Sequence, residues 1–249
     1  MPSCEMPCHG FCKSCKSCHS LSAKPAMEEA ERLQRLLDEQ KRIDFEKPAP
    51  GQKNLSTDFL YREARGKMFG VLVCEKANGT RLTLKAFSGQ YNGLWEVDGW
   101  APPLFKVHDF WQLLNPVEKK IKELGQALTG MTNGSREQQA IVQKRKEMSQ
   151  QLMKQIHGLY RLHNFRNQHR SLADLFPYNQ GIPTGTGDCC APKLLNYAAI
   201  KQLKPIGLAE FYWGKSNRSA TRSQATFYPA CTDKCGPILG FLLCGIKEL

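Results

Sequence analysis

Cysteine is the residue type in this chain whose number and spacing most clearly indicate chemistry. The 249 residues include 11 cysteines in three groups: Cys4, Cys8, Cys12, Cys15 and Cys18; Cys74 alone; and Cys189, Cys190, Cys231, Cys235 and Cys244. The number is odd and the N-terminus carries no apolar export signal, which argues against a secreted disulfide scaffold. We therefore expect free thiols or bound metal, in a cytoplasmic protein.

The last group of cysteines is the stronger metal candidate. Cys189 precedes a predicted helix, and Cys231-x-x-x-Cys235 lies on or just before another. Zinc binds deprotonated sulfur in a tetrahedral arrangement, and helix N-termini lower the pKa of thiols. We expect Cys189, Cys231 and Cys235 to converge on one zinc ion, with Cys190 or Cys244 as the candidate fourth ligand. The alternative is that these cysteines are simply small buried hydrophobic residues.

The first 24 residues form a leader rich in Cys, Ser and Lys. Two interpretations are open for this segment. It is either unstructured or a metal-binding segment, in which its cysteines hold zinc together with His9 or His19.

The elements that must position the last cysteines can be predicted from periodicity and turn signals. Strands are expected on both sides of Asn78-Gly79 within 67–89 and at 204–213; helices are expected at 26–42, 115–128, 135–164, 191–202 and 232–244. Asn115-Pro116-x-Glu118 and Ser135-x-x-Gln138 supply the capping signals of a helical hairpin. The pattern predicts an α+β fold: a small sheet with a β-hairpin, packed by helices. Residues 25–249 would form one domain, with the helical hairpin inserted at about 115–170.

Charge points to a polyanionic partner. The net charge is +12, and residues 131–170 contain eight Lys and Arg against two Glu. Nucleic acid is the commonest partner for such an excess, although a basic run can also be only a solvated helix face. Candidate RNA contacts on the helical hairpin and in the later 215–223 loop are Arg136, Lys144, Arg145, Lys146, Lys154, Arg161, Lys215, Arg218 and Arg222. No apolar run approaches the roughly 18 residues of a membrane helix, so no membrane partner is expected.

The order of elements around the last cysteines resembles that of zinc-dependent nucleobase deaminases: a hairpin, a helix that starts with Cys, a strand, and a helix with a Cys pair. Those enzymes carry His/Cys-x-Glu on one helix and Pro-Cys-x-x-Cys on the next. Here Ala191 and Pro192 occupy the positions two after Cys189 and Cys190, and the second pair is spaced by three residues. Asp188 and Glu210 are the only candidates to replace the missing catalytic Glu. A deaminase-like shape is expected more strongly than the activity.

Longer motifs resemble the N-terminal, non-catalytic region of bacterial RluA-family RNA pseudouridine synthases. The resemblance covers roughly residues 25–245 and is carried by KMFGVLV, AFSG, GDCCAPKLLNYA, KPIGLAEFYWG and FYPACTDKCGPILG. In that pattern the first Cys after the acid is the recurring one, which favours Cys189 over Cys190 as ligand. The family's catalytic His-Arg-Leu-Asp motif is absent from this sequence, so its activity does not carry over.

The resemblance implies an RNA-binding accessory domain that works with a separately encoded pseudouridine synthase. Two alternatives stay open at this point. The chain is a divergent zinc-dependent deaminase or hydrolase acting on a base or nucleotide, or it is a truncated or degenerate synthase.

Overall fold

The computed structural model describes residues 8–46, 53–176 and 181–249 of the chain. Its strands are β1 (Cys8–Cys12), β2 (Ser17–Leu21), β3 (Lys67–Glu75), β4 (Arg81–Phe87), β5 (Arg161–His163), β6 (His169–Ser171), β7 (Lys204–Trp213) and β8 (Thr226–Tyr228). Its α-helices are α1 (Met27–Gln40), α2 (Val107–Ala127), α3 (Arg136–Leu159), α4 (Leu172–Leu175), α5 (Cys190–Ile200) and α6 (Gly236–Leu242). Short 3-10 turns cover Lys24–Ala26, Lys53–Leu55, Asp58–Tyr61 and Ile246–Glu248. The mixture of helices and small antiparallel sheets confirms the α+β class.

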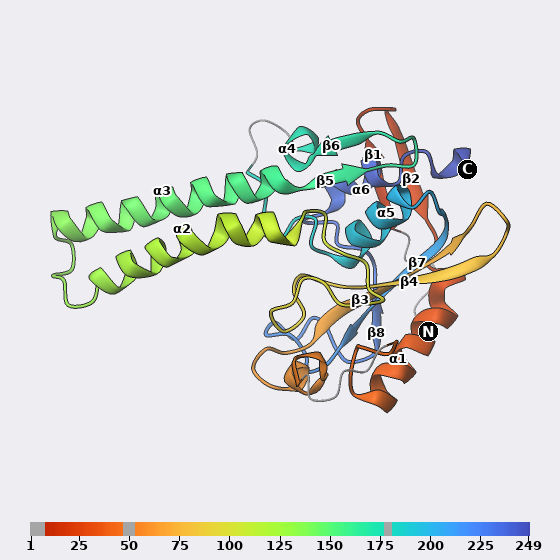
Figure 1. The fold of residues 1–249 in the computed structure, drawn as a ribbon, viewed down its shortest axis with the longest axis horizontal. Helices are drawn as coiled ribbons and strands as arrows, with labels where there is room; N and C mark the ends of the chain where they lie inside the picture. Colours follow the sequence, from red (N-terminus) through yellow and green to blue (C-terminus); the bar gives the residue numbers. More distant parts are fainter. Residues whose placement is uncertain (1–7, 47–52, 177–180) are drawn as a thin grey trace.

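The centre of the body is a four-stranded sheet of order β4-β3-β7-β8, with antiparallel neighbours throughout. Its two inner strands are apolar along most of their length because both faces are covered. Phe69, Val71 and Phe211 belong to the core on the α1 side. Leu72 and Leu208 belong to the core shared with α5 and α6. Helices α1 and α5 therefore lie on opposite faces of the sheet (Figure 1).

Helix α5 approaches the sheet very closely at Gly70 of β3. A Cβ atom added at Gly70 would lie 2.6 Å from the Cβ atom of Cys190. Cys190 is fully buried there, and its thiol donates to the Met68 carbonyl at 3.4 Å. Gly70, the glycine of KMFG, therefore lets the start of α5, which carries Cys190, pack directly against β3.

Helices α2 and α3 pair and project from the body as a long hairpin, called here the α2–α3 hairpin (Figure 1). Ser135 caps α3 as predicted, because its side chain accepts from the backbone N–H of Gln138 at 3.1 Å. The predicted start of the first helix at Asn115 is wrong: α2 begins at Val107 and continues through Pro116. The hairpin helices therefore span 107–159 rather than about 115–170.

The early start of α2 has a tertiary cause. Phe110 is buried at the root of the hairpin. Its ring stacks on that of Phe105, with 5.1 Å between the ring centres, and meets the Trp95 ring edge-on, with 5.2 Å between the centres. The Phe105 ring also contacts Tyr160, the residue that ends α3. These aromatic contacts favour helix before Pro116, whose missing N–H removes one backbone hydrogen bond. The same cluster fixes the hairpin to the body.

Two further differences concern the ends of the chain. Residues 8–26 form the β1–β2 hairpin and a 3-10 turn that pack against the body, with Cys8 and Cys12 buried. Cys4 lies outside the described residues. The last α-helix is shorter than predicted and covers only Gly236–Leu242. Within the part of the chain that the structure describes, no helix is long and apolar enough to cross a membrane.

Candidate metal centre and nucleic-acid interface

Three cysteines that are distant in sequence meet in one cluster. The sulfur atoms of Cys189, Cys231 and Cys235 all lie within 4.8 Å of one another. Cys189 is the N-cap residue of α5, and Cys235 is the N-cap residue of α6. The two helix starts converge because α5, which packs on the central sheet, also packs against α6, which lies on the β1–β2 hairpin. The cluster can hold a metal ion, and these are the three ligands predicted from sequence.

Hydrogen bonds favour thiolate character at Cys231. The thiols of Cys189 and Cys235 donate to its sulfur, and so do the backbone N–H groups of Lys234 and Cys235. Together these bonds hold the pKa of Cys231 well below its usual range. The pKa of Cys189 is raised instead, because it keeps its proton in these hydrogen bonds and is buried. An ion that accepts three sulfurs would replace this proton sharing by direct coordination.

Neither candidate for a fourth ligand joins this cluster. The Cys190 thiol faces the Met68 carbonyl on β3. Cys244 lies two residues past the end of α6, in a different group with Cys12, Cys15 and His19. Among the described residues the Cys189 group therefore offers three protein ligands. A fourth position would be left to water or to another small ligand.

The two carboxylates singled out from sequence lie close to the cluster, and both are engaged. Glu210 is buried on β7, and its carboxylate accepts from the backbone N–H of Ala191 at 2.6 Å. Burial raises the pKa of Glu210 to about 7. Asp188 accepts from the hydroxyl of Tyr160 at 2.6 Å, and burial raises its pKa above the usual value. Both groups therefore have a structural partner as well as a place beside the thiols.

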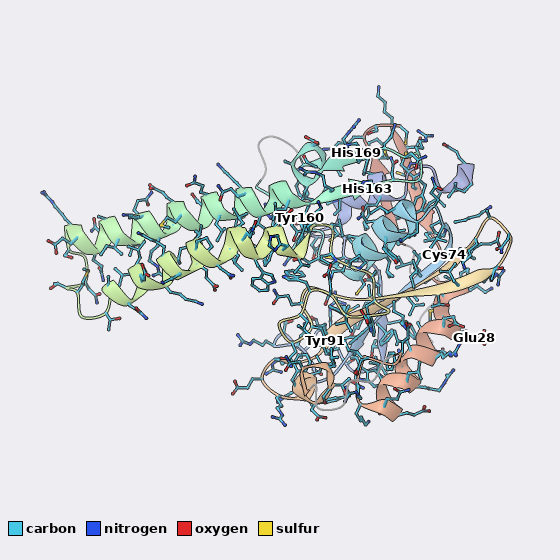
Figure 2. The ribbon with its side chains drawn as sticks, viewed as in Figure 1. Glu28, Cys74, Tyr91, Tyr160, His163 and His169 are labelled. Carbon is cyan, nitrogen blue, oxygen red and sulfur yellow. The ribbon has the colours of Figure 1, made fainter. Side chains whose placement is uncertain are left out.

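Asp188 also connects the Cys189 thiol cluster to the α2–α3 hairpin. Tyr160 lies where α3 meets the body (Figure 2). A Cβ atom added at Gly187, which has a φ of +89°, would lie 3.0 Å from the Tyr160 ring. The glycine-rich segment before Cys189 is thus shaped to seat Tyr160. The root of the hairpin therefore lies next to the thiol cluster.

Lys193 was not among the residues predicted from sequence to have a functional or structural role. Its side chain is fully buried, and its ammonium donates to the carbonyls of Phe87 and Gly89 at 3.0 and 2.7 Å. The ammonium also lies 4.8 Å from the centre of the Phe87 ring. Burial lowers the pKa of Lys193 to about 8. The only sequence signal for its burial was its position in an otherwise apolar helix, one turn after Cys189.

The predicted RNA-binding residues divide into two surfaces. Arg136, Lys144, Lys146 and Lys154 are exposed on α3, whereas the Arg145 guanidinium packs against Gly125 of α2, with its carbon 3.5 Å from the position of an added Cβ. Arg161 lies at the hairpin root and donates to the carbonyls of Gly158 and Tyr160. The structure therefore leaves four of these six side chains free on the hairpin.

The second basic surface lies in the 214–225 loop. Lys215 and Arg218 line a shallow pocket together with Arg62, Glu63 and Arg65. The Arg65 guanidinium fixes the loop by donating to the Ser216 carbonyl at 2.8 Å. Arg222 stands apart, with its guanidinium 4.5 Å from the centre of the Tyr228 ring. Arg62 and Arg65 were not among the predicted contacts, because they lie some 150 residues before the loop they join.

Comparison of the chain with protein-family models, with curated proteins and with solved structures gives no match.

Proposed function

We propose that this chain is a zinc-containing RNA-binding module whose α2–α3 hairpin carries the RNA. The observation that supports this proposal most strongly is the combination of shape and charge. The hairpin projects from the body, and no other described element lies beside its free end (Figure 1). Residues 106–161 contain ten Lys and Arg against five Asp and Glu. A projecting basic rod presents cations to a phosphate backbone from several sides.

The cations on the hairpin are available for phosphates. Lys119, Lys120, Lys144, Lys146 and Lys154 are exposed, and none forms an ion pair within the described residues. Lys122 is the exception on this surface, because it pairs with Glu118 at 3.2 Å. An unpaired surface cation costs little to transfer to a phosphate, since no protein partner has to be given up. We assign Arg145 to the seam between the helices rather than to RNA.

The loop surface offers a second place for a phosphate. Lys215, Arg218, Arg62 and Arg65 come together there against a single Glu63. Arg222 on Tyr228 presents a flat guanidinium, which can stack with a base. We expect this surface to add affinity, whereas the hairpin supplies most of the salt-dependent term.

We assign zinc to Cys189, Cys231 and Cys235. Three closely spaced sulfurs are ligands that zinc prefers, and the reducing compartment expected for this chain keeps them as thiols. The ion would join the starts of α5 and α6 next to the seat of Tyr160. Its role in this account is to keep the root of the hairpin in place.

The link to pseudouridine synthesis rests on the sequence resemblance alone. We propose that the module serves a separately encoded synthase, and that by itself it forms no pseudouridine because the His-Arg-Leu-Asp motif is absent. Incubation with bulk RNA from a synthase-deficient strain, followed by nucleoside analysis, checks this. Product formation by the chain alone would contradict it.

A second candidate function is a zinc hydrolase or deaminase acting on a base or nucleotide. The observation that favours it is the three-ligand thiol cluster with the buried Glu210 carboxylate nearby. Such a site would leave a position for water beside a group that can move a proton. Deamination of cytosine or adenine bases that is lost in Cys231→Ala would support this function over the RNA-binding module.

The proposed function is tested by RNA affinity as a function of salt. If about five phosphates are neutralised on a single-stranded oligonucleotide, log K falls against log salt with a slope of about −3 to −4. In Lys144→Glu/Lys146→Glu/Lys154→Glu we expect about tenfold or greater loss of affinity and a slope flattened by about 2.

A matched control carries the same change of charge at the opposite end of the molecule. Lys76, Lys201 and Lys247 are exposed there, in or near the β3–β4 turn, the end of α5 and the C-terminus (Figure 1). Lys76→Glu/Lys201→Glu/Lys247→Glu should keep most of the affinity. Equal losses in both triple variants would show that net charge, and not the hairpin, controls binding.

A further inference from the structure

A second group of metal-binding side chains lies at the junction of the two ends of the chain. The ligand atoms of Cys12, Cys15, His19 and Cys244 all lie within 4.8 Å of one another. The Cys15 sulfur is 3.0 Å from Nε2 of His19 and 3.7 Å from the sulfur of Cys244. Cys12 and Cys244 are fully buried. Unlike the Cys189 group, this one contains four protein ligands.

The local sequence brings three of these ligands together. Strand β1 ends at Cys12, and β2 begins at Ser17, so that Cys12 and Ser17 are partners at the closed end of the hairpin. The chain turns between them through Cys15 and Lys16, and Lys16 has a φ of +54°. This left-handed residue turns the chain directly after the second cysteine. His19 then follows on β2, with its ring against the Cys15 sulfur.

Helix α6 delivers the fourth ligand because two glycines allow a very close approach. A Cβ atom added at Gly10 would lie 2.3 Å from the Gly240 nitrogen, and one added at Gly240 would lie 2.2 Å from Phe11. Strand β1 and α6 therefore meet backbone to backbone. The position of Cys244 is fixed further by its carbonyl, which accepts from the Phe165 N–H at 3.0 Å.

We propose that Cys12, Cys15, His19 and Cys244 form a second zinc site, of the closed structural type, which fastens the N-terminal hairpin to the C-terminal end of α6. Three thiolates and one neutral imidazole complete a tetrahedral shell and leave no position for water. Binding releases the thiol protons, and the ion joins residues 229 apart in sequence. Helix α6 would then be held by one metal centre before its first residue and by another after its last.

A disulfide between Cys15 and Cys244 is the chemical rival of this site. It would use two of the sulfurs and leave Cys12 and His19 without a role. A zinc site needs all four side chains. The two possibilities therefore differ in how the protein responds to substitution of His19, which cannot take part in a disulfide.

The test is the zinc content of the full chain, purified without chelator under reducing conditions. We expect two equivalents in the wild type and one in Cys244→Ser and in His19→Ala. His19→Cys should restore the second equivalent. When Co²⁺ replaces zinc, the absorption bands of His19→Cys should be shifted relative to those of the wild type, because a sulfur ligand replaces a nitrogen ligand. Cys18→Ser is the matched control, since Cys18 is exposed on β2 and belongs to neither group. It should retain both equivalents.

The results also separate this site from the Cys189 centre. A single wild-type equivalent that is lost in Cys235→Ala but kept in Cys244→Ser would overturn the second site and leave the first. A single equivalent lost only in Cys244→Ser would do the reverse. Two equivalents retained in His19→Ala would also overturn the proposal.

Discussion

The body and the α2–α3 hairpin differ in what holds them together. The central sheet is covered on both faces, and two sulfur-rich groups lie around α6. The buried residues of the hairpin helices are Phe110, Leu152, Ile156 and His157, and all four lie near the root. Toward its free end the hairpin depends on partly exposed contacts between two helices. Tertiary packing fixes the body, and the metal ions proposed for the two sulfur-rich groups would add to it, whereas the hairpin is free to carry charge.

The largest expected effect comes from removing the Cys189 metal centre. Structural zinc contributes on the order of 10 kcal/mol in small zinc-binding peptides. If half of that acts here, Cys235→Ala lowers the melting temperature by about 10–20 °C. Adding Cys189→Ala to this variant should lower the melting temperature little further, because the ion of this centre is already lost.

Thermal unfolding with and without chelator checks this expectation. Chelator should lower the melting temperature of the wild type, and should lower that of Cys235→Ala by less, because this variant keeps only the Cys12, Cys15, His19 and Cys244 site. Additive costs of about 1 kcal/mol for each cysteine, with the same chelator effect in the wild type and in Cys235→Ala, would show that these residues are only buried hydrophobic side chains.

The next largest expected effect is the loss of stability when a large apolar side chain of the body is truncated, compared with truncation of an apolar side chain on the hairpin. Phe69 is fully buried, and its ring stacks on Phe211 at 5.9 Å. Val142 on α3 is 50% exposed. Phe69→Ala should cost about 3–5 kcal/mol, and Val142→Ala less than about 0.5 kcal/mol. Urea unfolding of both variants measures the two costs. Similar costs would mean that the hairpin is packed as firmly as the body.

A pH effect is expected from the buried Lys193. Burial lowers its pKa from the ordinary 10.5 to about 8, so between these values the unfolded chain holds a proton that the folded protein has released. The penalty of burying the ammonium is therefore complete below pH 8 and disappears as the pH rises toward 10.5. Relative to Lys193→Met, the wild type should gain about 2 kcal/mol between pH 7.5 and 9.5.

Urea unfolding of both proteins at the two pH values tests this. The variant controls for the cysteines, which titrate in the same range in both proteins. A difference between wild type and variant that stays constant with pH would show that the Lys193 ammonium keeps an ordinary pKa in the fold.

The smallest effect is expected at the free end of the hairpin. Ser135→Ala removes the side chain that accepts from the Gln138 N–H. Loss of such a cap costs about 1 kcal/mol of helix stability. Amide exchange should rise in the first turns of α3 and stay unchanged in β3 and β7. Increased exchange across the central sheet would show that hairpin and body unfold as one unit.

Much of the fold could be predicted where the local pattern and the tertiary structure agree. Strand β7 has the predicted bounds, and the β3–β4 hairpin turns at Asn78-Gly79. The Ser135 cap could also be predicted, because in this exposed part of the hairpin the local sequence determines where the helix begins. The convergence of Cys189, Cys231 and Cys235 followed from their places at two helix starts.

The rest depended on contacts between distant segments. The cap signal at Asn115 was overridden by the aromatic contacts of Phe110 at the root. Strands β5 and β6 were missed because each has three residues, too few for an alternation pattern. The place of Cys244 was missed because its partners lie on the N-terminal hairpin, and nothing near residue 244 encodes that neighbour.

The most direct test of the RNA-binding account is a map of the contact surface by ultraviolet cross-linking of the full chain to a single-stranded RNA, with identification of the linked peptides. We predict cross-links in α2 and α3, with a second set in the 214–225 loop. They should weaken on the hairpin in Lys144→Glu/Lys146→Glu/Lys154→Glu and persist in the triple variant at the opposite end. Cross-links confined to the body outside these segments, or unchanged by the hairpin substitutions, would contradict the account.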